Sequence, residues 1–284
     1  MSRFPQLPPH QSPKSLFSYI FAAFFVLAVI DSWRIAGIDP TIIFDAHGRA
    51  NLWKFVGGMF PPALSGQFLS LMLRPTFETI QISILGTLIA VGIGFPLGLL
   101  GTHTLAVRGI LNEADLQGAP FRRGLRTAVY LFARGLLSVF RSIPEFVWAF
   151  MFVRAVGLGP FPGVLAIGIA YGGMLGKVYS EIFESVNYRP LEALQSLGAN
   201  KLQIFFYGWF PQALPNFVSY TLYRWECAVR ASAILGLVGA GGLGQQIEIS
   251  MRMFNFNEVL TILMILFLMV AGVDYLSAKL RGLL

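Results

Sequence analysis

The sequence predicts an all-α integral membrane protein with six transmembrane helices. Of its 284 residues, 55% are hydrophobic and 12% are charged, which leaves too little polar surface to cover a soluble globule of this size. Uncharged runs are long enough for the roughly 20 residues that cross a bilayer. The Lys and Arg behind the net charge of +7 are spread among loops, which indicates membrane topology rather than a face that binds nucleic acid.

The first part of the chain, residues 1–75, is expected to hold one transmembrane helix and an outer interfacial segment. Residues 15–30 are uncharged, and no small-x-small cleavage site follows them. They are therefore expected to form a retained helix and not a signal peptide. Residues 34–75 include charged side chains and a Pro-Pro pair, so this stretch is too polar to cross.

Residues 76–284 are expected to form the main transmembrane domain. Its spans are predicted near residues 79–101, 128–153, 160–176, 213–238 and 259–275. In the first of these, Gly92, Gly94 and Gly98 are small packing positions. Pro144 interrupts the next, so we expect an interfacial helix before it and a crossing that starts near Ile143.

Charge and side-chain chemistry give the orientation and exclude several kinds of site. Lys and Arg are more frequent on the face that holds both termini and the loops 102–126 and 177–211, so this face is expected to be cytoplasmic. The single cysteine excludes a disulfide framework within the chain and a cysteine-based zinc site. The three histidines are far apart in sequence and predict no metal centre.

The loop after the fourth span has the features of a docking element for another protein. Pro190 suits the first position of a helix, and Glu192 in the first turn complements the helix dipole. Gly198 suits the left-handed residue that ends a helix, and Asn200 can cap a second one that begins at Lys201. The loop is thus predicted to be a short helix, a glycine and another helix.

Three charges fall near the middle of the fifth span, in the stretch Tyr223-Arg-Trp-Glu-Cys-Ala-Val-Arg230. Each costs about 2.5–3.5 kcal/mol there on insertion scales. Glu226 and Arg230 are spaced i, i+4 and can neutralise each other, whereas Arg224 stays unpaired. Two interpretations remain open: the cluster, with Tyr223, lines a path for an anionic solute, or it is an ion pair that stabilises the bundle.

The stretch Gly239-Ala-Gly-Gly-Leu-Gly244 matches the spacing of a dinucleotide-binding loop but lies between two spans, without the required βαβ unit. We expect Gly239, Gly241, Gly242 and Gly244 to form a flexible hinge at the outer mouth, and the alternative is a tight turn between two helices. Residues 173–178 resemble a phosphate-binding loop but lack its first glycine and its Ser or Thr. ATP is therefore expected to bind to a partner protein.

Other charged residues carry less information. Glu145, directly after Pro144, is expected either to line the channel or to sit at the kink. Lys177, Glu181 and Glu184 are expected to form a solvated cytoplasmic extension of the fourth span.

The docking loop resembles the Glu-Ala-Ala loop of permease subunits in binding-protein-dependent ABC importers. It keeps Glu192, Ala193, Gly198 and Pro211, and departs from the pattern where Leu194, Gly208 and Phe210 stand. From Thr76 onward the chain resembles permeases of phosphonate importers, most specifically in the stretch Tyr223-Arg-Trp-Glu226. The glycine-rich stretch and Arg141-Ser-Ile-Pro144 are also similar to methionine-type permeases.

This resemblance implies the architecture of a type I ABC importer permease in the bacterial inner membrane, with both termini cytoplasmic. It implies a non-catalytic subunit without a cofactor, surrounded by membrane lipid. The implied protein partners are a periplasmic solute-binding protein, a second permease copy in a homodimer and cytoplasmic ATP-binding subunits. The ATP-binding subunits are expected to dock at Glu192, Ala193, Gly198 and Lys201. The expected solute is phosphonate or a similar small phosphorus oxyanion, carried by ATP-driven alternating access. The alternatives are phosphite, phosphate or an amino acid as solute, a secondary carrier, or a membrane enzyme.

Overall fold

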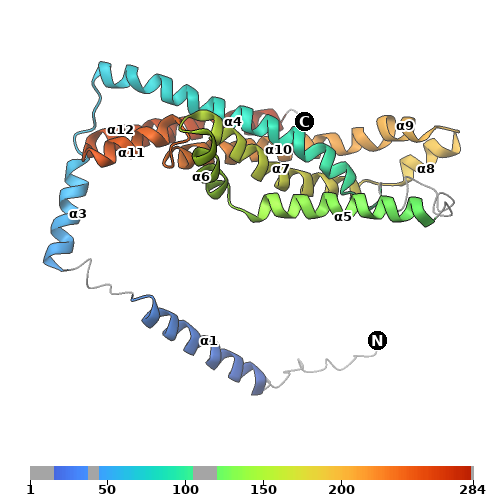
Figure 1. The fold of residues 1–284 in the computed structure, drawn as a ribbon, viewed down its shortest axis with the longest axis horizontal. Coiled ribbons are helices and arrows are strands. Elements are labelled where there is room, and N and C mark those ends of the chain that lie inside the picture. Colours follow the sequence, from blue (N-terminus) through green and yellow to red (C-terminus); the bar gives the residue numbers. More distant parts are fainter. Residues whose placement is uncertain (1–15, 38–44, 105–119, 283–284) are drawn as a thin grey trace, which may run out of the picture. The chain divides into compact units, whose positions relative to one another are not determined.

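The computed structural model describes residues 16–37, 45–104 and 120–282, and all regular structure in these ranges is helical (Figure 1). Contacts divide the chain into two units, residues 1–57 and 58–284. The first unit contains α1 (Leu16–Ile35) and most of α3 (Ala46–Gly58). The expected domain boundary after residue 75 lies inside α4, which continues through that position without a break.

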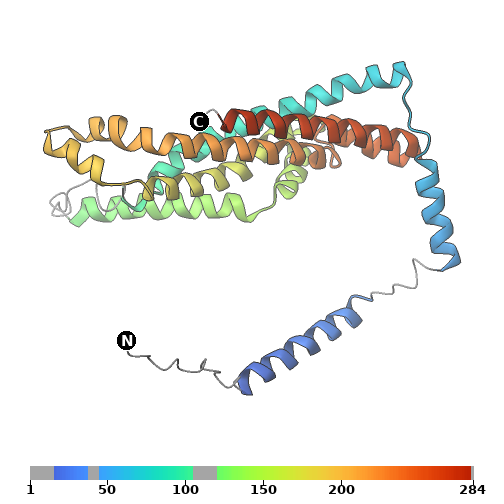
Figure 2. The ribbon, with the colours of Figure 1, turned by 180° about the vertical axis from the view of Figure 1, so that it is seen from behind.

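The second unit is a helical bundle. Figures 1 and 2 show its long helices running side by side, with the short helices α8 and α9 at one end and the turn between α11 and α12 at the other. The elements are α4 (Gly66–Leu100), α5 (Pro120–Ser142), α6 (Glu145–Val156), α7 (Pro160–Glu184), α8 (Arg189–Ser196), α9 (Lys201–Gln203), the π-helix η3 (Ile204–Trp209), α10 (Phe210–Gly236), α11 (Gly242–Arg252) and α12 (Phe256–Arg281).

Helix α7 is the centre of this bundle, because α4, α5, α6 and α10 all pack against it. Glycines allow α4 to approach it closely. A Cβ on Gly94 would lie 2.9 Å from the Gly172 oxygen, and one on Gly98 would lie 2.8 Å from the Gly176 oxygen. The predicted packing role is therefore confirmed for Gly94 and Gly98 but is wrong for Gly92, which faces open space.

Aromatic side chains fill the core where α10 begins. The rings of Phe183 and Phe217 have centroids 4.7 Å apart, and those of Tyr179 and Phe217 are 4.8 Å apart. Trp209 is fully buried, and its indole nitrogen donates to the Phe183 oxygen at 2.9 Å. These contacts fix the start of α10 against the end of α7.

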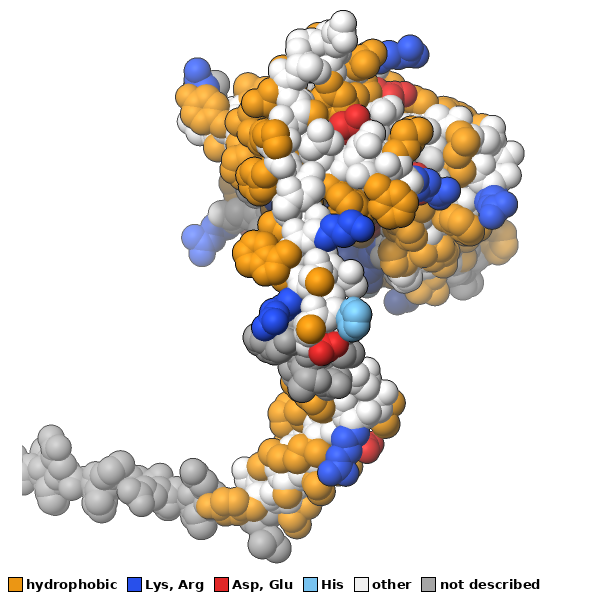
Figure 3. All heavy atoms as spheres, turned by 90° about the vertical axis from the view of Figure 1, so that its left-hand side faces the viewer, with side chains coloured by type: hydrophobic (Ala, Val, Ile, Leu, Met, Phe, Trp, Pro, Cys, Tyr) orange, Lys and Arg blue, Asp and Glu red, His pale blue; other side chains and the backbone are white. Residues whose placement is uncertain are grey.

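Among the described residues, four helices are long and apolar enough to cross a membrane: residues 18–35 of α1, and α4, α7 and α12. The pair α5–α6, bent by 87° at Pro144, is long and apolar enough to cross as one broken span. At 12 residues, α6 is too short to cross alone, so a crossing here needs both helices. Hydrophobic side chains cover much of the visible surface in Figure 3, as a membrane environment requires.

The six-span count is not confirmed. Helix α10 has 27 residues, so at about 1.5 Å per residue it is long enough to cross. Its polar residues make it less hydrophobic than α4, α7 and α12. This helix carries Arg224, Glu226 and Arg230, the charges that the sequence predicts as a candidate site.

Candidate solute pathway and coupling segment

The predicted helix–glycine–helix loop is present as local structure, and we call residues 189–209 the coupling segment. Helix α8 places Pro190 second and Glu192 in the first turn. Gly198 follows with φ of +82°, in the left-handed region that favours glycine. The Asn200 side chain accepts from the Gln203 amide at 2.9 Å and closes a capping box.

Two of the three departures from the family pattern, Leu194 and Gly208, compensate for each other in space. Leu191 is fully buried and anchors α8 to the bundle. A Cβ on Gly208 would lie 2.6 Å from Leu191 Cδ2 and 2.9 Å from Leu194 Cδ1. A large residue at 194 therefore occupies space that a small residue at 208 leaves open, and α8 packs closely on η3.

The exposed surface of the coupling segment carries the predicted residues and also large apolar residues that were not predicted from the sequence. Glu192, Ala193, Gly198 and Lys201 are all exposed. Large apolar side chains on the same segment are also exposed: Leu197 by 84%, Leu202 by 69%, Phe206 by 60% and Tyr207 by 77%. The sequence feature that could have predicted them is the presence of large apolar residues in a loop otherwise rich in polar ones.

The predicted ion pair between Glu226 and Arg230 is wrong. Glu226 faces α12, and its Oε1 accepts from Arg281 Nη2 at 2.6 Å. Arg230 is exposed, and its Nη2 lies 3.8 Å from Cys227 Sγ. The i, i+4 spacing relates residues within one helix only. Glu226 turns toward α12 instead and meets the long side chain of Arg281 in the last turn of that helix.

Arg224 makes no ion pair with any carboxylate in the described ranges, as the sequence predicted, but it is held by aromatic side chains. Its Nε donates to the Tyr220 hydroxyl at 3.0 Å. Its Cζ lies 5.5 Å from the ring centroids of Tyr171 and Tyr220 and 5.9 Å from that of Tyr223. We call these three side chains the tyrosine cage. The structure thus brings Tyr223 and Arg224 together, and the sequence analysis missed Tyr171 and Tyr220.

The cage lies beside the middles of two other helices. Trp225 Nε1 donates to Ser83 Oγ of α4 at 3.3 Å, and Tyr171 is central in α7. Glu145 is the first residue of α6, directly after Pro144, and its role in lining the channel stays a prediction. The arrangement offers a positively charged region in the middle of the bundle.

The glycine-rich stretch forms a tight turn between α10 and α11. Gly239, Gly241 and Gly242 have φ of +92°, +81° and +70°. A Cβ on Gly244 would lie 1.8 Å from the Ala233 oxygen, so this glycine is required by a close backbone approach. The turn fits the alternative that the sequence left open, and its action as a hinge stays a prediction.

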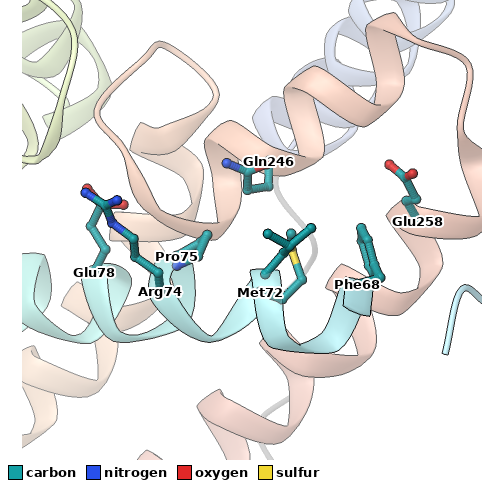
Figure 4. A pocket seen from close by; sticks show the side chains of 8 residues that line it. Phe68, Met72, Arg74, Pro75, Glu78, Gln246 and Glu258 are labelled. Atoms are coloured by element: carbon teal, nitrogen blue, oxygen red, sulfur yellow. The ribbon is translucent and has the colours of Figure 1, made fainter. Parts of the chain in front are cut away.

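Two side chains of α4 fasten this turn to the bundle. The Gly242 amide donates to Glu78 Oε2 at 3.1 Å, and the Leu243 amide donates to Thr79 Oγ1 at 2.9 Å. They satisfy the first free amides of α11, which has no cap of its own. Glu78 also borders a pocket of about 490 Å³ between α4, α11 and α12 (Figure 4), lined by Phe68, Leu71, Met72, Arg74, Pro75, Glu78, Gln246 and Glu258.

The charged end of α7 differs from the solvated extension that was expected. Glu184 Oε1 accepts from the His103 amide at 2.8 Å and from Arg134 Nη2 at 3.1 Å, so it ties α7 to α4 and α5. Lys177 and Glu181 form a partly exposed i, i+4 pair at 2.6 Å. Residues 173–178, which resemble a phosphate-binding loop, lie inside α7. Within the described ranges no three His, Cys, Asp or Glu side chains are placed to hold a metal ion.

Comparisons with known proteins identify the family of this chain. Residues 118–281 match the family described as binding-protein-dependent transport system inner membrane component. The chain is 34% identical over 260 residues to a phosphite transport system permease protein of Stutzerimonas stutzeri, covering 92% of this chain and 86% of the relative. It is 29% identical over 256 residues to a phosphate-import permease protein of Mycolicibacterium smegmatis, covering 90% and 44%.

The fold is also similar to a solved structure. An inward-facing conformation of the MetNI methionine ABC transporter matches with a TM-score of 0.63 and 22% identity, covering 77% of this chain and 98% of that one. This likeness confirms the helical fold of a type I importer permease. The family match and the relatives together place the chain: it belongs to the family of binding-protein-dependent transport system inner membrane components.

Proposed function

We propose that this chain is the permease subunit of an ABC importer that carries a small phosphorus oxyanion, such as phosphonate, phosphite or phosphate, into the cytoplasm. The observation that carries the solute class is Arg224, a guanidinium in the middle of the bundle without an ion pair among the described residues. The names of the relatives, which refer to phosphite and phosphate, support the same class.

The arginines of the bundle differ in whether they have an acidic partner. Arg134 is paired with Glu184, and Arg281 is paired with Glu226. Arg224 and Arg230 have no such partner in the described part of the chain. An arginine in the membrane that lacks a carboxylate keeps its charge available, and the guanidinium fork suits tetrahedral oxyanions. A path for an anion needs this excess of positive charge.

The remaining parts of the importer are assigned to partners. Cytoplasmic ATP-binding subunits bind the coupling segment, whose exposed apolar side chains and Glu192 form the contact. A periplasmic binding protein delivers the solute, and a second permease chain, identical in a homodimer, completes the path. Both termini are cytoplasmic. Closure of the ATP-binding subunits moves the coupling segment, and the helices then alternate between outward and inward access.

Reconstitution tests this function. The purified complex, with its ATP-binding subunits and binding protein, is placed in proteoliposomes, and ATP-dependent uptake of phosphite, methylphosphonate, phosphate, sulfate and methionine is compared. We expect uptake of at least one phosphorus oxyanion and none of methionine. Arg224→Gln should reduce uptake at least tenfold, whereas Arg252→Gln, a change to an exposed arginine of α11, should not. Uptake of methionine without any phosphorus oxyanion would overturn the proposal.

A further inference from the structure

Part of the Arg224 guanidinium remains available for a ligand. Its Nε is used by the Tyr220 hydroxyl, but neither terminal nitrogen has a hydrogen-bond partner in the described ranges. The tyrosine cage stabilises the positive charge through the ring faces without neutralising it, as a carboxylate would. The fork of Arg224 is thus oriented and charged before any anion arrives.

The Tyr171 ring lies 5.5 Å from Arg224 Cζ and carries a hydroxyl that is a second possible donor. Tyr171 is only 4% exposed, yet its hydroxyl makes no hydrogen bond to any described group. Buried tyrosine hydroxyls normally have a partner. Among the described residues, the unpartnered side-chain atoms that are sealed from solvent belong to Asp274 and Ser277. The Tyr171 hydroxyl is therefore unpartnered among the described residues and is not among the atoms sealed from solvent.

The geometry points to a selectivity subsite in which the fork of Arg224 and the hydroxyl of Tyr171 bind one tetrahedral oxyanion, while Tyr220 positions the guanidinium. This inference rests on the proposed function and adds to it the residues that select the solute. Two oxygens of the anion accept from the fork and a third accepts from Tyr171. Because no carboxylate must be displaced, little reorganisation opposes binding.

A built-in reporter allows the subsite to be tested directly. Cys227 is the single cysteine of the chain, lies one turn from Arg224 and is half-buried beside Arg230. In the purified permease–ATPase complex, without binding protein, the rate at which the anionic reagent methanethiosulfonate ethylsulfonate modifies Cys227 is followed by mass spectrometry. Phosphite should slow the modification, whereas chloride at the same ionic strength should not.

The variants assign the roles. Tyr220→Phe and Tyr171→Phe each remove one hydroxyl and keep the ring, and each should raise the half-protecting phosphite concentration about tenfold, the effect of one hydrogen bond to a charged group. Tyr275→Phe, a change to an exposed tyrosine of α12, is the matched control and should have no effect. In an Arg224→Gln background protection should be weak, and Tyr220→Phe should add nothing, because the residue it positions is gone.

Two results separate this inference from the proposed function. Equal protection of the wild type and both Tyr→Phe variants by phosphite, or equal protection by chloride, would overturn the subsite. If wild-type proteoliposomes still took up phosphite, the proposed function would stand without it. A Tyr220→Phe effect that persists unchanged in the Arg224→Gln background would show a structural role and would also overturn the positioning role.

Discussion

The ion pair between α10 and α12 predicts that removing one partner destabilises the protein more than removing the other. The Glu226 side chain is 9% exposed and the Arg281 side chain 32% exposed, with 2.6 Å between Oε1 and Nη2. Breaking a fully buried pair costs about 3–5 kcal/mol, and an exposed pair contributes about 0–1 kcal/mol. Arg281→Met strands a buried carboxylate and should cost about 2–4 kcal/mol, whereas Glu226→Gln leaves a cation that can turn to water and should cost about 1–2 kcal/mol.

Thermal unfolding of the purified complex in detergent measures both effects. The double variant Glu226→Gln/Arg281→Met should be more stable than the sum of the single changes predicts, because neither charge is then stranded. Arg230→Met is the matched control and should be within about 0.5 kcal/mol of the wild type, since Arg230 is exposed and does not pair with Glu226. Strong coupling of Glu226 to Arg230, with none to Arg281, would refute the assignment of partners.

Three further predictions concern the coupling segment, the glycine turn and the topology. Gly198→Pro should uncouple ATP hydrolysis from uptake in proteoliposomes. Gly198→Asn should retain at least half of the coupled uptake, because asparagine tolerates φ of +82°. Equal uptake by both variants would refute the role of the coupling segment in transmitting ATPase motion. Gly244→Ala should cost more than about 3 kcal/mol in thermal unfolding, because its Cβ would lie 1.8 Å from the Ala233 oxygen, whereas Gly272→Ala, with nothing within 4 Å, should be neutral. In a cysteine-free background, a cysteine at position 47 should react with an impermeant reagent from outside intact cells and one at position 197 should not; the reverse pattern would overturn the proposed orientation.

Local signals predicted the parts of the fold that depend on local backbone chemistry. Pro144 ends α5 because it cannot continue a helical hydrogen-bond ladder, and it stands at the N-cap of α6. Asn200 caps α9, and Gly198 takes the positive φ that ends the preceding helix. Each of these features is decided within a few residues, so one sequence suffices to find it.

Contacts between residues on different helices could not be predicted from local sequence patterns. Arg281 is 55 positions from Glu226, and no periodicity in either helix relates them. Tyr171 is likewise on a different helix from Arg224. The match between Leu194 and Gly208 is similar, because each residue alone departs from the family pattern and only the packing of α8 on η3 shows that the two departures fit. Sequence reasoning therefore predicts which residues are unusual but not which of them meet.

The corrected partner of Glu226 strengthens the argument for an anion path. If Glu226 had neutralised Arg230, one unpaired arginine would remain on α10, and a stabilising ion pair would explain most of the cluster. Arg281 neutralises Glu226 instead, so neither Arg224 nor Arg230 has an ion-pair partner among the described residues. A second copy of the chain in the complex would double this excess charge. The unpaired charge of α10 therefore supports the proposed path for an anionic solute.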